Sequence, residues 1–350
     1  MTLPPTTVTT TRSRMPAEFQ RHERTVLCWP ARRELYGELM PRAEDAHARV
    51  ARIIAEHEPV SMIVQPGPAA ARAAELCGGQ VEIVELPIDD SWFRDTGPIY
   101  VVNDTDDAGG RQRVATSWTF NGWGVKYAPW DRDALVAQRW AEHAGHVSKR
   151  IPMVLEGGSI TVDGEGTLVT TIQCLMHPNR NPGLTKLDIE ERLGDELGIS
   201  TTIWLPYGLL ADDDTDGHVD NVAAFARPGV LVVQGCDDPD EPDWLRMNVN
   251  ARWARGSADA AGRLLEVVEI PVLPFVEIGG ERRPVPYANF YIGNGFVLVP
   301  TAGHAADDDM IAIIAEQFPG REVIGFDVGA ILAHGGGGIH CITQQVPATP

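Results

Sequence analysis

Three short apolar segments recur along the chain at almost constant spacing. They begin at Gly166, Gly229 and Gly295 and read "GTLVTT", "GVLVVQ" and "GFVLVP", so one step covers 63 residues and the next covers 66. A further step back reaches "PIYVVND" near residue 100. A unit of about 65 residues, repeated about five times, would fill the 350 residues, as in solenoids and propellers whose units bury their sheets against one another. Chance recurrence is the alternative, because glycine followed by apolar residues begins many strands.

Helical patterns lie between these segments. Apolar residues at spacings of three and four predict helices over 41–58, 132–145, 186–198 and 308–320. The short Val- and Ile-rich runs between them predict strands, so the fold class is mixed α/β.

The chain offers no internal boundary between domains. No linker or block of charge divides it, which favours a single domain over residues 15–350. Residues 1–14 are rich in Thr and Pro and predict a flexible N-terminal tail.

The composition excludes several classes of partner. The chain carries 49 Asp and Glu against 29 Lys and Arg, a formal net charge of −20, which argues against nucleic acid and anionic membranes and suits a cationic substrate. Its five cysteines show no CxxC spacing, which argues against a disulfide framework or a zinc ribbon. The start lacks the apolar stretch of a signal peptide, and no apolar run approaches the roughly 20 residues that cross a bilayer. We therefore expect a soluble, cytoplasmic protein.

The most charged stretch is "ADDDTDGHVDNVAAFA" over 211–226. Its beginning resembles a calcium-binding EF-hand loop, but the twelfth position from Asp212 is Ala223, where that loop needs a bidentate glutamate. What remains is His218 and Asp220, which on an extended strand would project from the same face. Such a pair is a candidate general acid/base or metal ligand, and a solvated turn is the alternative. We find no companion ligands for zinc, so we expect no metal.

Two further acids lie next to predicted strands. Asp95 in "DDSWFRDTGPIYVV" precedes a strand in a tight Gly-Pro turn, with Trp92 nearby as an apolar or cation-stacking wall. The alternative is a plain turn in which Asp95 accepts hydrogen bonds from backbone amides. Glu156 in "VLEGGSITVDGEGTLVT" stands before two glycines in what is otherwise a strand and hairpin signal.

The last distinctive stretch is "GGGGIHCITQQVP", from Gly335 to Pro347. It matches neither standard phosphate loop, because Gly-Lys-Ser/Thr is absent and the 12 residues after Gly338 leave no room for a helix or second strand. The glycines instead leave clearance around Cys341, whose own strand would be short. A lone cysteine is otherwise an inert core residue. The aromatic stretch "YANFYIGNGFVLVP" is more typical of core than of a site.

Taken together, these stretches resemble the agmatine deiminase family of the guanidine-modifying (pentein) superfamily, related to bacterial-type peptidylarginine deiminase. The matching stretches run almost end to end, in family order: "SWFRDTGPIYV", "FNGWGVKYAPWDRD", "EGGSITVDGEGTLVTT", "HPNRNP", "DDDTDGHVDNVA", "YANFYI" and "GGGGIHCITQQVP". The resemblance implies a five-bladed, pseudo-symmetric α/β propeller of ββαβ-type units, which agrees with the spacing of about 65 residues.

The resemblance also implies roles for particular residues. Cys341 would be the nucleophile, His218 the general acid/base and Glu156 the carboxylate paired with it. Asp95 and Asp220 would grip the guanidinium. Trp92 and Asp214 would line the part of the pocket that holds the substrate tail. Two positions depart from the family pattern: Thr161 stands where histidine is frequent, and Val125 stands where a second glycine is common, and both are expected to alter the pocket wall.

The implied reaction is hydrolysis of agmatine to N-carbamoylputrescine and ammonia through a covalent intermediate on Cys341, without a cofactor. A deiminase or amidinotransferase acting on another guanidino compound is the alternative, with Arg94 and Arg180 as candidate partners for the carboxylate of arginine. A non-catalytic binder of polyamines or guanidines is the third. We also expect a homo-oligomer, and a Cys341 thiol whose pKa is raised by the nearby acids until a cationic substrate binds.

Overall fold

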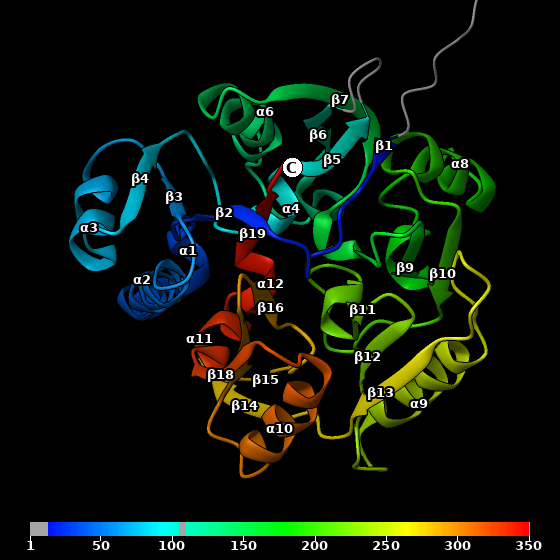
Figure 1. Cartoon of the computed structure of the whole chain (residues 1–350). Coiled ribbons are helices and arrows are strands. Elements are labelled where there is room, and N and C mark those ends of the chain that lie inside the picture. The colour runs from blue at the N-terminus through cyan, green and yellow to red at the C-terminus, as the bar shows by residue number, and fades with distance from the viewer. Residues whose placement is uncertain (1–12, 105–109, 350) are drawn as a thin grey trace, which may run out of the picture.

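The structure of the chain, a computed structural model, describes residues 13–104 and 110–349. Figure 1 shows its sheets around a central region in which the short helices α4 (Phe93–Thr96) and α12 (Ile339–Ile342) lie. The tail was predicted over residues 1–14, and residues 1–12 lie outside the described part of the chain. Its last two residues, Ser13–Arg14, form strand β1.

The described strands form five sheets of three or four strands and one separate two-stranded hairpin. In spatial order the five sheets are β1–β5 (Ile99–Asp104)–β6 (Arg111–Thr119)–β7 (Val147–Val154), β8 (Ile160–Val162)–β9 (Thr167–Thr171)–β10 (Thr201–Leu205), β11 (Ala223–Arg227)–β12 (Val230–Gln234)–β13 (Glu266–Ile270), β16 (Tyr291–Gly293)–β17 (Phe296–Thr301)–β18 (Glu322–Asp327), and β19 (Thr343–Pro347)–β2 (His22–Cys28)–β3 (Val60–Val64)–β4 (Val81–Glu85). The hairpin pairs β14 (Phe275–Ile278) with β15 (Glu281–Pro284).

All five sheets share one pattern. Two antiparallel strands are followed by a helix that returns the chain to a third strand, which lies parallel to the second. The five connecting helices are α2 (Met40–Ala55), α6 (Asp133–His143), α8 (Lys186–Leu197), α9 (Pro242–Arg255) and α10 (Asp307–Gln317). The remaining helical segments are α1 (Arg33–Tyr36), α3 (Pro68–Cys77), α5 (Gly122–Val125), α7 (Ile172–Leu175), α11 (Gly329–His334) and the 3₁₀ turns η1 (Gly37–Leu39), η2 (Gly157–Ser159) and η3 (Val219–Asn221).

The spacing found in the sequence corresponds to this unit. Gly166, Gly229 and Gly295 directly precede β9, β12 and β17, the second strands of three successive units. These strands are buried along their full length, because each lies between two neighbours and is covered on both faces, which explains their continuous apolar sequence. The step back to residue 100 was wrong by one strand: it reaches β5, the first strand of its unit, whereas the equivalent second strand β6 begins at Arg111.

The four predicted helices are present as α2, α6, α8 and α10. Helix α9 was missed because its apolar side chains do not gather on one face. Trp244, Leu245 and Trp253 are all partly exposed to solvent, so the sequence lacks the clear periodicity of an amphipathic helix.

The last described strand of the chain joins the sheet that begins with its second strand. Strand β19 pairs antiparallel with β2, and Thr343 lies opposite Leu27. The helical turn α12, which carries Cys341 and lies near the centre of Figure 1, immediately precedes β19, so closing this sheet also fixes the position of α12. No described helix combines the length and apolar character needed to span a membrane.

Candidate active site

Cys341 lies on α12, behind the run of four glycines, and is 5% exposed. A β-carbon at Gly337 would lie 2.6 Å from the Trp92 ring and 3.1 Å from Sγ of Cys341. A β-carbon at Gly338 would lie 2.3 Å from Oδ1 of Asn289. These contacts are shorter than side chains tolerate, so the glycines provide the clearance around the thiol that the sequence indicated.

Two expectations about this stretch were wrong. Cys341 lies on a helical turn rather than a strand, and both α12 and β19 follow Gly338, although we expected room for neither. The chain achieves this with very short elements, because α12 has four residues and β19 has five.

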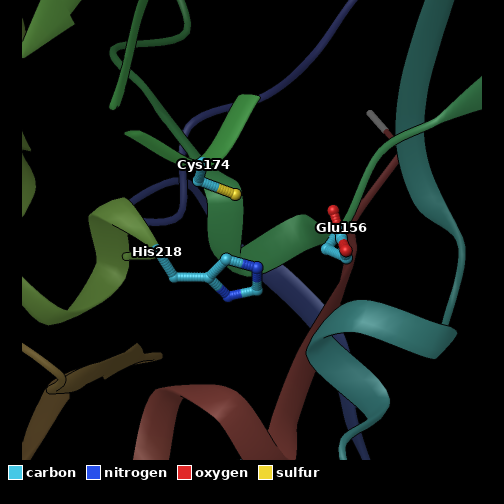
Figure 2. A group of neighbouring side chains, drawn as sticks. All are labelled: Glu156, Cys174 and His218. Atoms are coloured by element: carbon cyan, nitrogen blue, oxygen red, sulfur yellow. The ribbon is translucent and has the colours of Figure 1, made fainter. Parts of the chain in front are cut away.

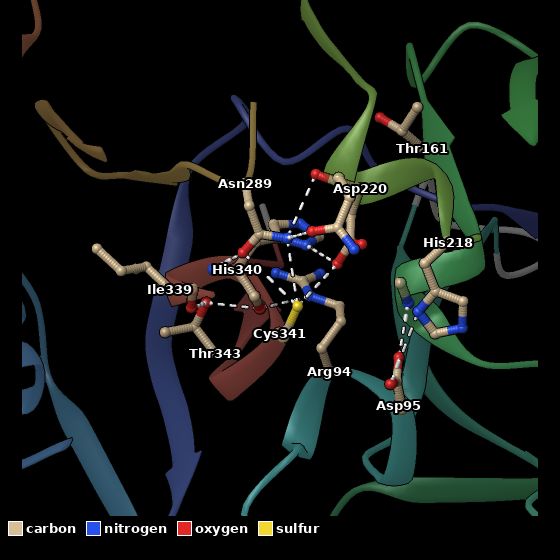
Figure 3. Close-up of polar contacts among 12 residues, drawn as sticks. Arg94, Asp95, Thr161, His218, Asp220, Asn289, Ile339, His340, Cys341 and Thr343 are labelled. Carbon is tan, nitrogen blue, oxygen red and sulfur yellow. Dashed lines mark hydrogen bonds and ion pairs between the residues drawn. The ribbon is translucent and has the colours of Figure 1, made fainter. Parts of the chain in front are cut away.

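Two polar side chains contact the thiol (Figure 3). Asn289 Nδ2 lies 3.2 Å from Sγ of Cys341, and Asp220 Oδ2 lies 3.4 Å from it. Burial, together with the negative charges of Asp220 and Asp95, raises the pKa of the Cys341 thiol well above its usual value. The predicted direction of this shift is therefore confirmed, with burial as the largest cause and two neighbouring acids contributing.

Asp95 lies on the helical turn α4, not in a helix-free turn. Its Oδ1 accepts a hydrogen bond of 2.9 Å from the backbone N–H of Gly158, and its Oδ2 accepts one of 2.9 Å from Nε1 of Trp123. Gly158 precedes β8 of the next unit, whereas Trp123 lies on α5, within the unit whose first strand follows Asp95. The carboxylate is therefore held by two directional contacts and is almost completely buried.

His218 immediately precedes the 3₁₀ turn η3, which carries Asp220, so the predicted strand at this point was wrong. Its backbone N–H donates to Oδ2 of Asp212, which also accepts from the hydroxyl of Thr215. The loop that resembled an EF-hand is thus organised by its own carboxylate. Nδ1 of His218 lies 3.8 Å from Oδ2 of Asp95. Burial opposes the charged imidazolium, but Asp95, Cys174 and Asp220 outweigh it and raise the pKa of His218 well above its usual value.

Glu156 and Cys174 lie beside His218 (Figure 2). One donor atom from each of Glu156, Cys174 and His218 lies within 4.8 Å of the other two, and all three side chains are buried. Oε1 of Glu156 accepts a hydrogen bond of 2.6 Å from Nε of Arg180. Glu156 therefore lies near His218, the residue it was predicted to pair with. Its direct hydrogen-bond partner is Arg180.

The group formed by Glu156, Cys174 and His218 is the set of donors that comes nearest to a metal site in the described chain. Its chemistry fits a cation poorly, because the Arg180 guanidinium already neutralises Glu156 and would repel a metal ion beside it.

The predicted residues converge around Gly158. A β-carbon there would lie 2.6 Å from Nδ1 of His218 and 2.9 Å from Oδ1 of Asp95. It would also lie 2.9 Å from Oδ2 of Asp220. Only a residue without a side chain allows these three groups to meet at one point, and the two acids can then face the thiol from different sides.

A cavity opens in front of Cys341. Trp92 and Asp214, the two residues expected at the substrate tail, both line it, together with Asp95, Trp123 and Tyr127. Tyr127 donates its hydroxyl hydrogen to Oδ1 of Asp214. The cavity thus has aromatic walls and is lined by three carboxylates, Asp90, Asp95 and Asp214, which suits a slender cationic molecule.

Neither departure from the family pattern lines this cavity. Thr161 lies on β8 and borders a separate cavity behind Asp220 and His340. Val125 is 66% exposed. The expected change in the pocket wall is therefore absent at both positions.

Val125 lies in a backbone conformation that favours glycine, with φ of 68°. We expect Val125→Gly to raise the free energy of unfolding by about 1 kcal/mol, because the left-handed conformation costs roughly 1–2 kcal/mol and exceeds the extra entropy that glycine loses. Chemical denaturation measures this change. Val147→Gly, at an exposed strand position, is the matched control and is expected to destabilise. Equal destabilisation by both substitutions would contradict the prediction.

Several contacts of the site escaped the sequence analysis. Asn289 was assigned to the core because it stands among aromatic strand residues, yet it contacts Cys341. Trp123 and Arg180 hold Asp95 and Glu156, and nothing near them in sequence signals this. A buried amide between aromatic residues is the one signal that was available, since a buried polar group needs a partner.

Comparison with known proteins agrees with this geometry. The model of the Porphyromonas-type peptidyl-arginine deiminase family matches residues 14–347. The chain belongs to this family. An agmatine deiminase of Pseudomonas aeruginosa is 40% identical, over 96% of this chain and 95% of its own length. An agmatine deiminase of Stutzerimonas stutzeri is also 40% identical, over 95% of each chain.

The family relationship extends to solved structures. The structure of the agmatine deiminase of Enterococcus faecalis superposes with a TM-score of 0.90 at 33% identity and covers 97% of this chain and 98% of that chain. The resemblance noted in the sequence is therefore confirmed, and with it the mixed α/β fold of this deiminase family.

Proposed function

We propose that the chain hydrolyses agmatine to N-carbamoylputrescine and ammonia. The observation that carries the proposal is a buried thiol at a cavity that Asp90, Asp95 and Asp214 also line, with His218 and Asp220 meeting Asp95 beside Gly158. The 40% identity to agmatine deiminases over nearly the whole chain supports it independently.

The two acids serve to hold a flat cation against the thiol. A guanidinium carbon is a poor electrophile, because resonance spreads its charge over three nitrogens. Asp95 and Asp220 would bind different edges of the guanidinium through charge-assisted hydrogen bonds and present its face to Cys341. Such positioning can lower the barrier by at most about 7–11 kcal/mol.

Substrate binding also activates the nucleophile. In the free enzyme the acids hold the thiol protonated, whereas a bound guanidinium neutralises them and favours the thiolate. The thiolate attacks the guanidinium carbon and forms a C–S bond. The C–N bond then breaks, and His218 gives its proton to the departing nitrogen, which leaves as ammonia.

Hydrolysis completes the cycle. His218, now neutral, takes a proton from water, which attacks the carbon of the S-alkylthiouronium intermediate. The C–S bond breaks, the remaining proton of the attacking water passes to the departing Cys341 sulfur, and N-carbamoylputrescine is released. This proton replaces the one that the thiol gave to the solvent when the thiolate formed. Glu156, which lies within 4.8 Å of His218 and is held by Arg180, is the carboxylate beside the imidazole in this proposal.

The opposite end of the cavity favours an amine over a carboxylate. Arg94 and Arg180, the two arginines proposed for binding a carboxylate, lie outside the lining of the cavity. Arg94 is bonded to Glu18 and Arg180 to Glu156, and both arginines are buried. Asp214 remains as the group that would bind the ammonium of agmatine.

The position of Arg283 favours arginine as a second candidate substrate. Its Nη1 lies 3.7 Å from Oδ2 of Asp214, and a second cavity lined by Arg283 shares Asp214 with the first. Arg283 would compete with an ammonium for Asp214 and could itself bind a carboxylate.

We therefore expect Arg283→Gln to shift the ratio of kcat/KM for agmatine over arginine by roughly tenfold toward agmatine, the equivalent of one partly exposed charge contact. Arg282→Gln is the matched control, because Arg282 lies on the same strand and pairs with Glu241 instead. An unchanged ratio in Arg283→Gln would show that Arg283 does not set the preference between agmatine and arginine.

The five sheets correspond to the five blades of a pseudo-symmetric α/β propeller in this proposal. The shared pattern of the sheets and the pairing of β19 with β2 support it. The homo-oligomer, the cytoplasmic location and a single domain over residues 15–350 stay predictions.

An ammonia-release assay tests the proposed function. The purified protein is incubated with agmatine, arginine, peptidyl-arginine and dimethylarginine, and Cys341→Ala serves as the control. We expect ammonia and N-carbamoylputrescine from agmatine, and none from the variant. Release from another of these compounds with none from agmatine would reassign the substrate, and activity on none of them would favour a guanidine binder.

A further inference from the structure

His340 precedes the nucleophile and is bound on both sides by carboxylates. Its Nδ1 lies 2.9 Å from Oδ2 of Asp220 (Figure 3). Its Nε2 lies 2.9 Å and 3.0 Å from the two carboxylate oxygens of Glu18. A neutral imidazole has one N–H and can donate to one carboxylate, so both contacts are satisfied when the ring carries two protons and a positive charge.

The surroundings of His340 favour this charged form. Burial and the positive charge of Arg94 oppose it, but Glu18 and Asp220 outweigh them and raise the pKa of His340 above its usual value. Arg94 also bonds Glu18 at 3.1 Å and the backbone carbonyl of His340 at 3.3 Å. The result is a buried chain of alternating charges, Arg94–Glu18–His340–Asp220, that ends at the Cys341 thiol.

This row of alternating charges includes Asp220, the acid that contacts the Cys341 thiol. Asp220 uses Oδ2 for both His340 and Cys341, and its Oδ1 has no hydrogen-bond partner among the described residues. A carboxylate bonded through one oxygen cannot turn freely. The other oxygen is then available in a fixed position for a cationic group.

We propose that His340 is a positioning residue that, anchored by Glu18, holds the Asp220 carboxylate in the orientation that receives the guanidinium. This inference rests on the proposed function and deepens it. His340 does not exchange protons with the substrate, a role that belongs to His218. It keeps Asp220 ionised in a buried place where a lone carboxylate would tend to take up a proton.

The test compares His340→Gln, His340→Asn and Glu18→Gln in pH profiles of kcat/KM for agmatine. Asparagine places a donor near the position of Nδ1 and can keep the bond to Asp220, whereas glutamine extends past that position. His340→Gln is expected to raise KM roughly 10- to 100-fold at pH 7, since it leaves a buried carboxylate without its partner. His340→Asn is expected to recover part of this loss.

The pH profile separates positioning from a merely structural role. The His340 contact lowers the pKa of Asp220 against the effect of burial. Without that contact, Asp220 would protonate at higher pH, so the acid limb of kcat/KM should move to higher pH and the defect should shrink as the pH rises. Glu18→Gln should move the same limb in the same direction by a smaller amount.

A matched control tests whether the loss of a buried histidine in general, rather than of His340, changes the pH profile. His47 is fully buried on α2 and bonds the carbonyl of Ala43, so His47→Gln removes a buried histidine away from the site. It is expected to leave the acid limb unchanged. If the wild-type protein hydrolyses agmatine but its acid limb is unmoved in His340→Gln and Glu18→Gln, the inference is wrong while the proposed function stands. If the wild-type protein has no activity on agmatine, the proposed function itself fails.

Discussion

Cys341→Ala is expected to reduce agmatine turnover by a factor on the order of 10⁴ or more, because the proposed covalent route runs through this thiol and removal of a catalytic nucleophile has effects of this size or larger. The acids and aromatic walls of the cavity remain in this variant. Agmatine should therefore still bind and should still raise the melting temperature in a concentration-dependent way. Continuous ammonia release and a thermal-shift titration measure the two quantities.

The other cysteines provide the controls for this prediction. Cys236→Ala changes a thiol outside the cavity in front of Cys341 and is expected to keep the turnover of the parent protein. Cys174 is the more searching comparison, because it is a buried thiol within 4.8 Å of His218 and thus the second candidate nucleophile. Activity that survives Cys341→Ala and disappears in Cys174→Ala would reverse the assignment.

Asp220→Asn is expected to have two effects of opposite sign. Turnover should fall roughly 10²-fold or more, because truncating a charge that pairs with a buried cation costs about 2–5 kcal/mol. Alkylation of the free enzyme by the neutral reagent iodoacetamide at pH 7 should become faster. The negative charge of Asp220 raises the pKa of Cys341, so its removal lowers that pKa and increases the thiolate fraction at neutral pH.

The alkylation experiment also examines how substrate activates the thiol. In the unchanged protein, a neutral alkylating agent should react slowly and a guanidinium-bearing one much faster, since the latter brings its own positive charge to the acids. Asp309→Asn, on the distant helix α10, is the matched control and should alter neither rate. A fall in both turnover and iodoacetamide reactivity in Asp220→Asn would show that the carboxylate does not suppress the thiolate.

The fold could be predicted from the sequence where the burial of side chains follows a regular pattern. Strands β9, β12 and β17 each lie between two neighbours and are buried throughout, so they appear as continuous apolar runs after Gly166, Gly229 and Gly295. Helix α9 was not accessible, because its tryptophans are partly exposed and disturb the helical periodicity.

The candidate site was accessible for a different reason. Asp95, His218 and Cys341 come from segments far apart in the chain, and no local pattern links them. Their association rested on the resemblance of several motifs in order to one family. In the structure Asp95 and Cys341 line one cavity, and His218 lies 3.8 Å from Asp95. What could not be predicted depends on tertiary contacts: Glu18 meets His340 across 322 residues of sequence.

The short elements near the nucleophile were also beyond sequence reasoning. We expected His218 and Asp220 on a strand, because alternate residues on a strand face the same way, but the side chain of Asp212 turns this segment into a compact loop. A hydrogen bond from a backbone amide, here that of His218, to a side chain six residues earlier leaves no periodic signal in the sequence.

The most direct test of the central claim is to trap the covalent intermediate. The protein is mixed with agmatine, quenched in acid during turnover and analysed by intact-mass and peptide mass spectrometry. The account predicts an adduct with the mass of agmatine less ammonia, on the peptide that contains Cys341, absent from Cys341→Ala. Turnover with no adduct on any cysteine under rapid quenching, or an adduct on Cys174, would contradict it.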